Sequence, residues 1–255
     1  MVLIIVVLYV KNKFFMAIKK IIIIASAKGG VGKSTLTASL AHYLSKSSLV
    51  GILDADIYGP SQHTIFNIKD QKLKTKKIND EFFYEPIIKD GIKLSSMGFI
   101  LDSESSATWR GPMLSSALKQ LIHKTEWGDI DFLLIDMPPG TGDAYLTICK
   151  ELKIDLCILT SSPHELSLID TKRSFNTLKK LGITKYLYVI NDCINSGIDT
   201  IKHILSEGIE SFSISFDKDL HVFNFKNMEE QFKGCLLYTS PSPRDVEESR
   251  MPSSA

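Results

Sequence analysis

A glycine-rich stretch near the amino terminus carries side chains that could hold the phosphates of a nucleotide. The stretch reads Lys28-Gly29-Gly30-Val31-Gly32-Lys33-Ser34-Thr35. Glycines allow the backbone to approach an anion and to turn its N–H groups toward it. Lys33 can reach the terminal phosphates, and the hydroxyl of Ser34 can ligate Mg²⁺. Residues 28–35 therefore predict an ATP site in which Ser34 is a metal ligand.

Carboxylates that could complete a site for Mg²⁺ and ATP follow two apolar stretches. Asp136 ends the apolar run 132–135 and suits the Mg²⁺ carboxylate of a phosphate-loop enzyme. Asp54 and Asp56 follow the other apolar run, residues 49–53. One of these two could orient a water against the γ-phosphate and the other could reach the metal, and their spacing leaves open which does which. The residues predict Mg²⁺-dependent ATP hydrolysis, with Lys33, Asp54 and Asp56 as catalytic residues.

A strand must lead into the glycine-rich stretch, and a helix must follow it. The run Ile21-Ile22-Ile23-Ile24 is typical of a strand buried on both faces. Leu36, Leu40 and Leu44 recur at helical spacing and give the next segment an apolar stripe. Further buried strands are predicted at residues 49–53, 92–97, 132–135, 156–159 and 187–190, and an edge or half-buried strand at 211–216.

The alternation of strands and helices predicts the fold class. Four of the predicted strands end in a polar residue, and ligands of open parallel sheets bind at the carboxyl ends of the strands. We predict an α/β fold: a doubly wound, mostly parallel sheet with helices on both faces. A helix should open at Trp109 and run to about His123. Residues 69–77 hold five lysines and are expected to form a solvated loop rather than a docking patch.

Both ends of the chain differ in character from this domain. Residues 2–10 are apolar but too short to span a bilayer, which takes about 20 residues. Residues 234–255 are rich in serine and proline and bury too little apolar area to become ordered. We interpret residues 1–15 and 234–255 as non-native or disordered extensions. The expected ATPase domain is residues 16–233, with its own carboxyl end missing.

Composition restricts the partners and the compartment. The formal net charge is +1, which gives no general attraction to nucleic acid or to acidic membranes, so neither is an expected partner. The four cysteines show no paired spacing such as Cys-x-x-Cys and suggest no disulfide framework. A reducing cytoplasm is therefore the expected compartment.

Several strings of residues together resemble one family. The loop has Ala27 where the strict phosphate-loop pattern has glycine, and Lys28 adds a second lysine at its head. Three further strings are Asp54-Ala55-Asp56-Ile57-Tyr58-Gly59-Pro60-Ser61, Trp109-Arg110-Gly111-Pro112-Met113 and Ile135-Asp136-Met137-Pro138-Pro139-Gly140-Thr141-Gly142-Asp143. Over residues 17–195 the chain resembles the Mrp-type ATPases, the iron–sulfur cluster carrier branch of the MinD/ParA group with its deviant Walker A loop.

The resemblance implies roles that the residues alone do not. It implies a homodimer with ATP and Mg²⁺ as cofactors, in which Lys28 reaches the partner's nucleotide and takes part in catalysis. Asn191 should contact the adenine. A [4Fe–4S] cluster should be held between the subunits for assembly and transfer to apo iron–sulfur proteins.

The sequence departs from the family where the cluster ligands are expected. Relatives usually place a Cys-x-x-Cys pair shortly after the position of Asn191, whereas this chain has the single Cys193 there. Two copies of Cys193 in a dimer supply two thiolates, fewer than the usual four. Cys149 and Cys157 fall on a helical and a strand stretch and are expected to be small buried hydrophobes.

Two other functions are compatible with a phosphate-loop fold. A positioning or partition ATPase without a cluster would use ATP-dependent dimerisation to bind a membrane or nucleoid, and would want a basic amphipathic tail or surface. A small-molecule kinase would need a substrate-binding insertion, for which only the lysine-rich stretch is available. The family strings favour the iron–sulfur carrier.

Overall fold

The computed structural model describes residues 18–57, 59–69, 71–78, 80–99, 111–192 and 209–215. The interpretations of residues 1–15 and 234–255 and the role expected of Cys193 therefore lie outside the described residues. The predicted opening of a helix at Trp109 lies outside them as well.

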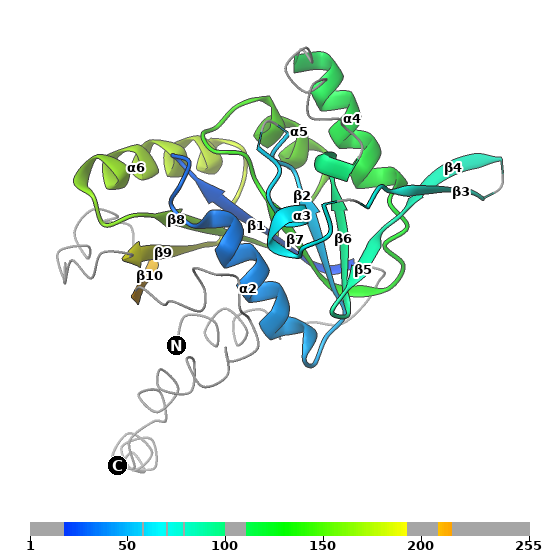
Figure 1. Cartoon of the computed structure of the whole chain (residues 1–255). Helices are drawn as coiled ribbons and strands as arrows, with labels where there is room; N and C mark the ends of the chain where they lie inside the picture. The colour runs from blue at the N-terminus through cyan, green and yellow to red at the C-terminus, as the bar shows by residue number, and fades with distance from the viewer. Residues whose placement is uncertain are drawn as a thin grey trace, which may run out of the picture.

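One sheet organises the described part of the chain (Figure 1). It has eight strands in the order β10-β9-β8-β1-β7-β2-β6-β5, and all neighbours are parallel except β5 and β6. The strands are β1 (Ile18–Ser26), β2 (Val50–Asp54), β5 (Ile87–Lys89), β6 (Ile92–Ser96), β7 (Ile130–Asp136), β8 (Leu156–Ser161), β9 (Tyr186–Asp192) and β10 (Glu210–Ser215). The strand expected at 211–216 is confirmed as the edge strand β10.

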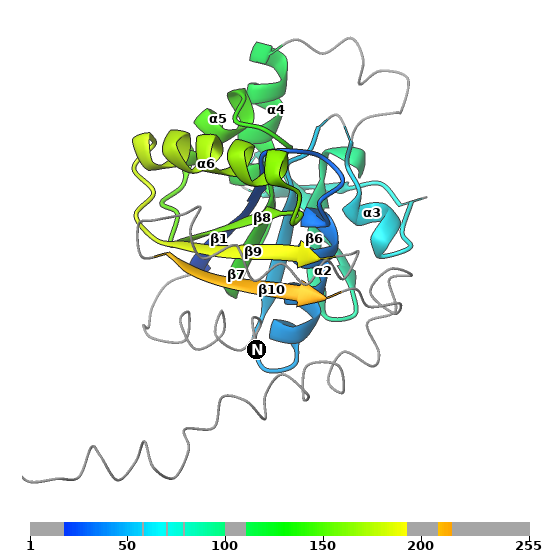
Figure 2. The ribbon, with the colours of Figure 1, turned by 90° about the vertical axis from the view of Figure 1, so that its left-hand side faces the viewer.

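Helices cover both faces of this sheet (Figure 2). The first face carries α2 (Lys33–Ser45) and α3 (Gln62–Ile65). The second carries α4 (Gly111–Lys124), α5 (Asp143–Glu151) and α6 (Glu165–Lys180), and a short 3-10 turn η1 (Met97–Phe99) follows β6. The prediction of a doubly wound, mostly parallel α/β fold is confirmed.

Alternating residues of β1 build the two cores. Ile22 and Ile24 belong to the cluster beneath α2, whereas Ile23 and Ala25 belong to the cluster beneath α4, α5 and α6. All four are fully buried. Because successive side chains of a strand point to opposite faces, an unbroken apolar run is what a strand covered on both sides requires.

The lysine-rich stretch is not a loop along its whole length, which corrects the prediction. Residues 74–78 form β3 (Lys74–Ile78), which pairs with β4 (Glu81–Glu85) in an antiparallel hairpin beside α4. The lysines of this strand are solvent-exposed, as expected. The strand is stabilised by its partner, which places Phe83 opposite Lys76 and Phe82 opposite Lys77. The lysines themselves gave no strand signal.

Candidate nucleotide site

The glycine-rich loop joins the end of β1 to the start of α2, at the carboxyl edge of the sheet. Gly30 and Gly32 have φ angles of 76° and 84°, which favour glycine, and Gly32 is the N-cap of α2. A Cβ on Gly32 would lie 2.2 Å from Nδ2 of Asn191, so a larger residue there would displace the Asn191 amide. That Nδ2 donates a hydrogen bond to the carbonyl of Val31 at 3.1 Å. Asn191 therefore packs against the loop.

Lys33 and Asp136 meet in the interior behind this loop. The Lys33 ammonium lies 2.6 Å from Oδ1 of Asp136, and the two side chains are 7% and 0% exposed. The sequence separation is 103 residues, bridged by the parallel pairing of β1 with β7. The same ammonium lies 3.5 Å from the hydroxyl oxygen of Ser34. The structure thus brings together the lysine, the hydroxyl and the carboxylate that the sequence singled out.

Asp54 and Asp56 have different surroundings. Asp54 is fully buried, and its Oδ2 accepts hydrogen bonds from the backbone N–H groups of Ser61 and Gln62 and from the hydroxyl of Ser96. Burial, with the charge of Asp136 nearby, raises the pKa of Asp54 to about 7. Its carboxyl group holds the turn that follows β2 and is inaccessible to solvent.

Asp56 instead lines a cavity of about 460 Å³ above the phosphate loop. Seven residues of the loop share that cavity: Lys28, Gly29, Gly30, Gly32, Lys33, Ser34 and Thr35. Val31 lies at the same turn with its side chain buried. The Asp56 carboxylate accepts a hydrogen bond from the N–H of Gly59 at 3.1 Å. Of the two aspartates, Asp56 is therefore the one that shares a cavity with the phosphate loop.

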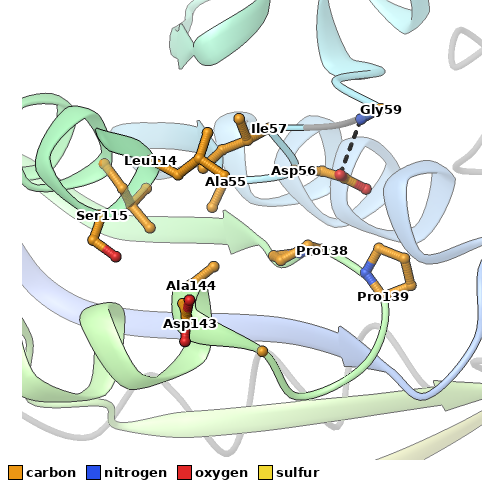
Figure 3. Close-up of a pocket in the computed structure, with 12 residues that line it drawn as sticks. Ala55, Asp56, Ile57, Gly59, Leu114, Ser115, Pro138, Pro139, Asp143 and Ala144 are labelled. Atoms are coloured by element: carbon orange, nitrogen blue, oxygen red, sulfur yellow. Dashed lines mark hydrogen bonds between the residues drawn. The ribbon is translucent and has the colours of Figure 1, made fainter. Parts of the chain in front are cut away.

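A second cavity, of about 590 Å³, adjoins the first (Figure 3). It lies between the turn after β2, the loop after β7 and the helices α4 and α5, and its walls are mostly apolar. Asp56, Gly59 and Pro139 line both cavities. The two loops that border the phosphate site therefore also form the walls of a neighbouring hollow.

Two hydrogen bonds hold the loop after β7 against the end of β1, and a third ties the loop to α5. The N–H of Met137 donates to the carbonyl of Ile24, and the N–H of Gly140 donates to the carbonyl of Ser26. The hydroxyl of the fully buried Tyr145 donates to the carbonyl of Pro138 at 3.0 Å. Sequence reasoning missed Tyr145, which gave only the signal of an apolar position in a helix.

The ammonium of Lys28 pairs with α6. Its Nζ lies 3.0 Å from Oδ2 of Asp170, whereas the carbonyl of Lys28 accepts a hydrogen bond from the hydroxyl of Ser26. The Lys28 ammonium is the main reason that the pKa of Asp170 is lowered, and Arg173 adds to it. Sequence reasoning missed Asp170, because the residue pattern of a helix does not show which distant loop a surface carboxylate will contact.

The donors at this site fit Mg²⁺ and do not fit an iron–sulfur cluster. Hydroxyl and carboxylate oxygens from Ser34, Asp56 and Asp136 are the hard ligands that Mg²⁺ takes. The described residues include no group of three or more His, Cys, Asp or Glu side chains that could hold a metal ion. Cys157 is fully buried and Cys149 half-buried, and burial raises the pKa of both thiols, which disfavours the thiolate that a cluster needs.

Comparison with known proteins identifies the family to which the chain belongs. The model of the NUBPL iron-transfer P-loop NTPase family matches residues 17–201. The chain belongs to this family. The resemblance to iron–sulfur cluster carriers drawn from the loop strings is thereby confirmed.

Individual relatives of this NUBPL-family chain agree. It is 41% identical over 194 residues to an iron–sulfur cluster carrier protein of Pseudomonas fragi, covering 75% of this chain and 67% of that protein. An ADP-bound nucleotide-binding protein of Archaeoglobus fulgidus matches with 32% identity and a TM-score of 0.66, covering 84% of this chain and 89% of the other. The Mg-ADP complex of MinD from Pyrococcus horikoshii, at 21% identity and a TM-score of 0.60, covers 81% and 85% and shares the fold.

The match with the curated relatives is partial in length. The chain spans about two thirds of the Pseudomonas protein and about half of several other carriers. No helix among the described residues is long and apolar enough to cross a membrane.

Proposed function

We propose that this chain is a homodimeric, Mg²⁺-dependent ATPase that assembles iron–sulfur clusters or transfers them to apo-proteins. The observation that carries the ATPase part is the buried pair of Lys33 and Asp136 behind a loop with two glycines at positive φ. Membership of the NUBPL family and 41% identity to an iron–sulfur cluster carrier protein support the proposed role in cluster transfer.

The residues act on ATP in a defined order. The N–H groups of residues 28–35 and the start of α2 bind the phosphates. Lys33 exchanges its contact with Asp136 for the terminal phosphates, which frees one oxygen of that carboxylate. Asp136 and the hydroxyl of Ser34 would then hold Mg²⁺, which when bound neutralises charge on the β- and γ-phosphate oxygens. Asn191 lies beside the loop, where an adenine contact is proposed.

The surroundings of the two aspartates support a division of their roles. Asp56 shares the cavity with the phosphate loop and is proposed to orient the attacking water. Asp54 is occupied by the backbone of the following turn and is proposed to hold that turn. Lys28 is proposed to supply charge to the nucleotide of the partner subunit, in the manner of an arginine finger.

The cluster is proposed as cargo held between two subunits. Cys193 is the candidate ligand in this chain, since burial raises the thiol pKa of the half-buried Cys149 and of the fully buried Cys157. The free thiols of these two residues accord with a cytoplasmic location, which is part of the proposal. The positioning alternative has behind it only likeness to solved structures at 25% identity or below, so we do not propose it.

Two measurements on the purified full chain test this function. Phosphate release from ATP should require Mg²⁺ and should be lost in Asp56→Asn, while ATP binding to that variant persists. Anaerobic reconstitution with iron and sulfide should give a chromophore that an apo [4Fe–4S] enzyme can take up, restoring its activity. Absence of ATP turnover in the unmodified chain would refute the proposed ATPase activity. Absence of transferable iron would refute the proposed role in iron–sulfur cluster transfer.

A further inference from the structure

Gln62, the first residue of α3, has a buried side chain that links three elements of the nucleotide site. It is 1% exposed. Its Nε2 donates to Oδ2 of Asp136 at 2.7 Å and to the carbonyl of Ser34 at 3.1 Å. Its backbone N–H donates to Oδ2 of Asp54 at 3.0 Å. One residue therefore contacts the ends of β2 and β7 and the first turn of α2.

The chemistry of its partners fixes the orientation of the Gln62 amide. The carboxylate of Asp136 and the carbonyl of Ser34 can only accept, so the amide nitrogen must face them. The amide oxygen then has no hydrogen-bond partner among the described residues. Leaving a buried polar group without a hydrogen bond is unfavourable, so the open amide oxygen of Gln62 calls for an explanation. An acceptor left open beside Ser34 and Asp136 suits a site that a hydrated metal completes.

The two oxygens of Asp136 are divided between two donors. Lys33 takes Oδ1 and Gln62 takes Oδ2. A lysine that turns to the phosphates leaves Oδ1 open, whereas the Gln62 amide has no phosphate to move to. The carboxylate would then keep one fixed oxygen and present the other.

We propose that Gln62 is a positioning residue for the Mg²⁺ site: it holds Oδ2 of Asp136 so that Oδ1 would be available to Mg²⁺ when nucleotide binds. This inference rests on the proposed binding of Mg²⁺ and ATP. Gln62 does not touch the reacting atoms, and it acts through the orientation of Asp136. Groups that orient a metal's ligands typically change metal affinity by about 10–100-fold when removed.

The alternative is that Gln62 merely fastens α3 to the sheet. In that case its loss would lower stability and weaken ATP binding equally with and without Mg²⁺. The positioning role predicts a change in the Mg²⁺-dependent part alone.

The test compares Gln62→Met with wild type in the full-length chain, by calorimetric titration of ATP in EDTA and in excess Mg²⁺. Methionine keeps the length of the side chain and removes its hydrogen bonds. We expect ATP affinity in EDTA to stay within about twofold, and the gain in affinity on adding Mg²⁺ to fall by about tenfold. The Mg²⁺ concentration for half-maximal hydrolysis should rise by a similar factor.

Gln120→Met is the matched control. Gln120 lies on α4, is exposed, and accepts one hydrogen bond from the hydroxyl of Tyr84 at 3.3 Å. This variant should keep the wild-type response to Mg²⁺. Gln62→Asn, whose amide is too short to span Asp136 and Ser34, should repeat the effect of methionine and serves if Gln62→Met does not fold.

Equal losses in EDTA and in Mg²⁺, or no loss in either, would overturn the inference while leaving the proposed function intact. If the ATP affinity of the wild-type protein were the same with and without Mg²⁺, both this inference and the proposed Mg²⁺-dependent function would be overturned. The two failures are therefore distinguishable from the same set of titrations.

Discussion

At the scale of the residue, Lys33 and Asp136 form a buried ion pair in which each partner compensates the other. Two carboxylates, Asp54 and Asp136, are fully buried near this one ammonium. The Lys33 ammonium lies 2.6 Å from Oδ1 of Asp136, so a phosphate that takes up the ammonium must compete with this carboxylate. Nucleotide binding must therefore exchange one charge partner for another, which links the stability of the site to its occupancy.

Removing Lys33 should damage both activity and stability. Lys33→Ala leaves Asp136 buried and unpaired, which typically costs about 3–5 kcal/mol. We expect no Mg²⁺-dependent phosphate release and a reduced free energy of unfolding in urea. The double variant Lys33→Ala/Asp136→Asn, without the unpaired charge, should recover part of the stability and none of the activity. Undiminished turnover in Lys33→Ala would contradict the assignment of the phosphate loop.

The buried carboxyl of Asp54 predicts a dependence of stability on pH. Its pKa is about 7 in the folded chain because burial and Asp136 disfavour its charged form, against about 3.9 when unfolded. The folded state therefore holds the proton more tightly, and this contribution to stability is present at low pH and is lost as pH rises toward 7. Urea unfolding of nucleotide-free protein in EDTA should show this decline between about pH 4 and 7. Asp54→Asn should have a flatter profile, and a profile as steep as wild type would exclude Asp54 as its source.

At the scale of the element, the strands were readable from sequence and the side-chain bridges between them were not. The apolar runs 21–24 and 132–135 predicted β1 and β7. Asp136, which follows the second run, is the last residue of β7. Parallel pairing then required Lys33 and Asp136 to meet at one edge. Gln62 gave no such signal, because its function depends on where the short helix α3 comes to lie.

The same contrast explains the lysine-rich hairpin. β3 consists mostly of lysines, and it pairs with aromatic residues of β4, which are supplied by a neighbouring segment. The sequence around Asp170 on α6 likewise does not reveal its ion pair, since its partner Lys28 lies far away in the sequence. Contacts between elements depend on the packed arrangement, and local residue patterns do not contain it.

The ion pair of Lys28 with α6 predicts how the lysine is released for its proposed role across the dimer. Asp170→Asn should weaken the hold on Lys28 and raise the rate of hydrolysis by about two- to fivefold, as expected for a partly exposed pair. Phosphate release measured against protein concentration gives this rate. Arg173→Gln, which removes the other partner of Asp170, should leave the rate unchanged.

A mixing experiment checks that Lys28 acts in trans. Lys28→Ala alone should bind ATP and fail to hydrolyse it, and so should Asp136→Ala. A mixture of the two should regain a fraction of the activity, because one composite site then has both groups. If every mixture stays inactive, or if Lys28→Ala alone is active, the role across the dimer is wrong.

At the scale of the whole molecule, the described domain supplies a nucleotide site and no cluster ligand. The family assignment joins that site to iron transfer, and Cys193 is the candidate thiolate in this chain. A cluster held by two such residues of a dimer would need further ligands from elsewhere, so it should be weakly held and easily passed on.

Reconstitution of cysteine variants tests this arrangement. Cys193→Ser should reduce the iron bound after anaerobic reconstitution to background, because no other accessible thiol is proposed as an anchor. Cys149→Ser, which changes a half-buried thiol on α5, should leave the bound iron unchanged. Iron analysis and absorbance give both results. Iron content that does not respond to Cys193→Ser would exclude this residue as the anchor.

The position of β1 in the sheet has a consequence for how the protein is made. β1 lies between β7 and β8, so both of its neighbours are translated more than a hundred residues after it begins. At about 5–20 residues per second, the ribosome takes roughly 5–20 s to pass from Lys33 to Asp136. During that time the isoleucine run of the newborn chain has no partner strand and is prone to aggregate. Residues 22–26 of β1, which are fully buried in the finished sheet, are thus the ones expected to need chaperone protection until β7 and β8 have been translated.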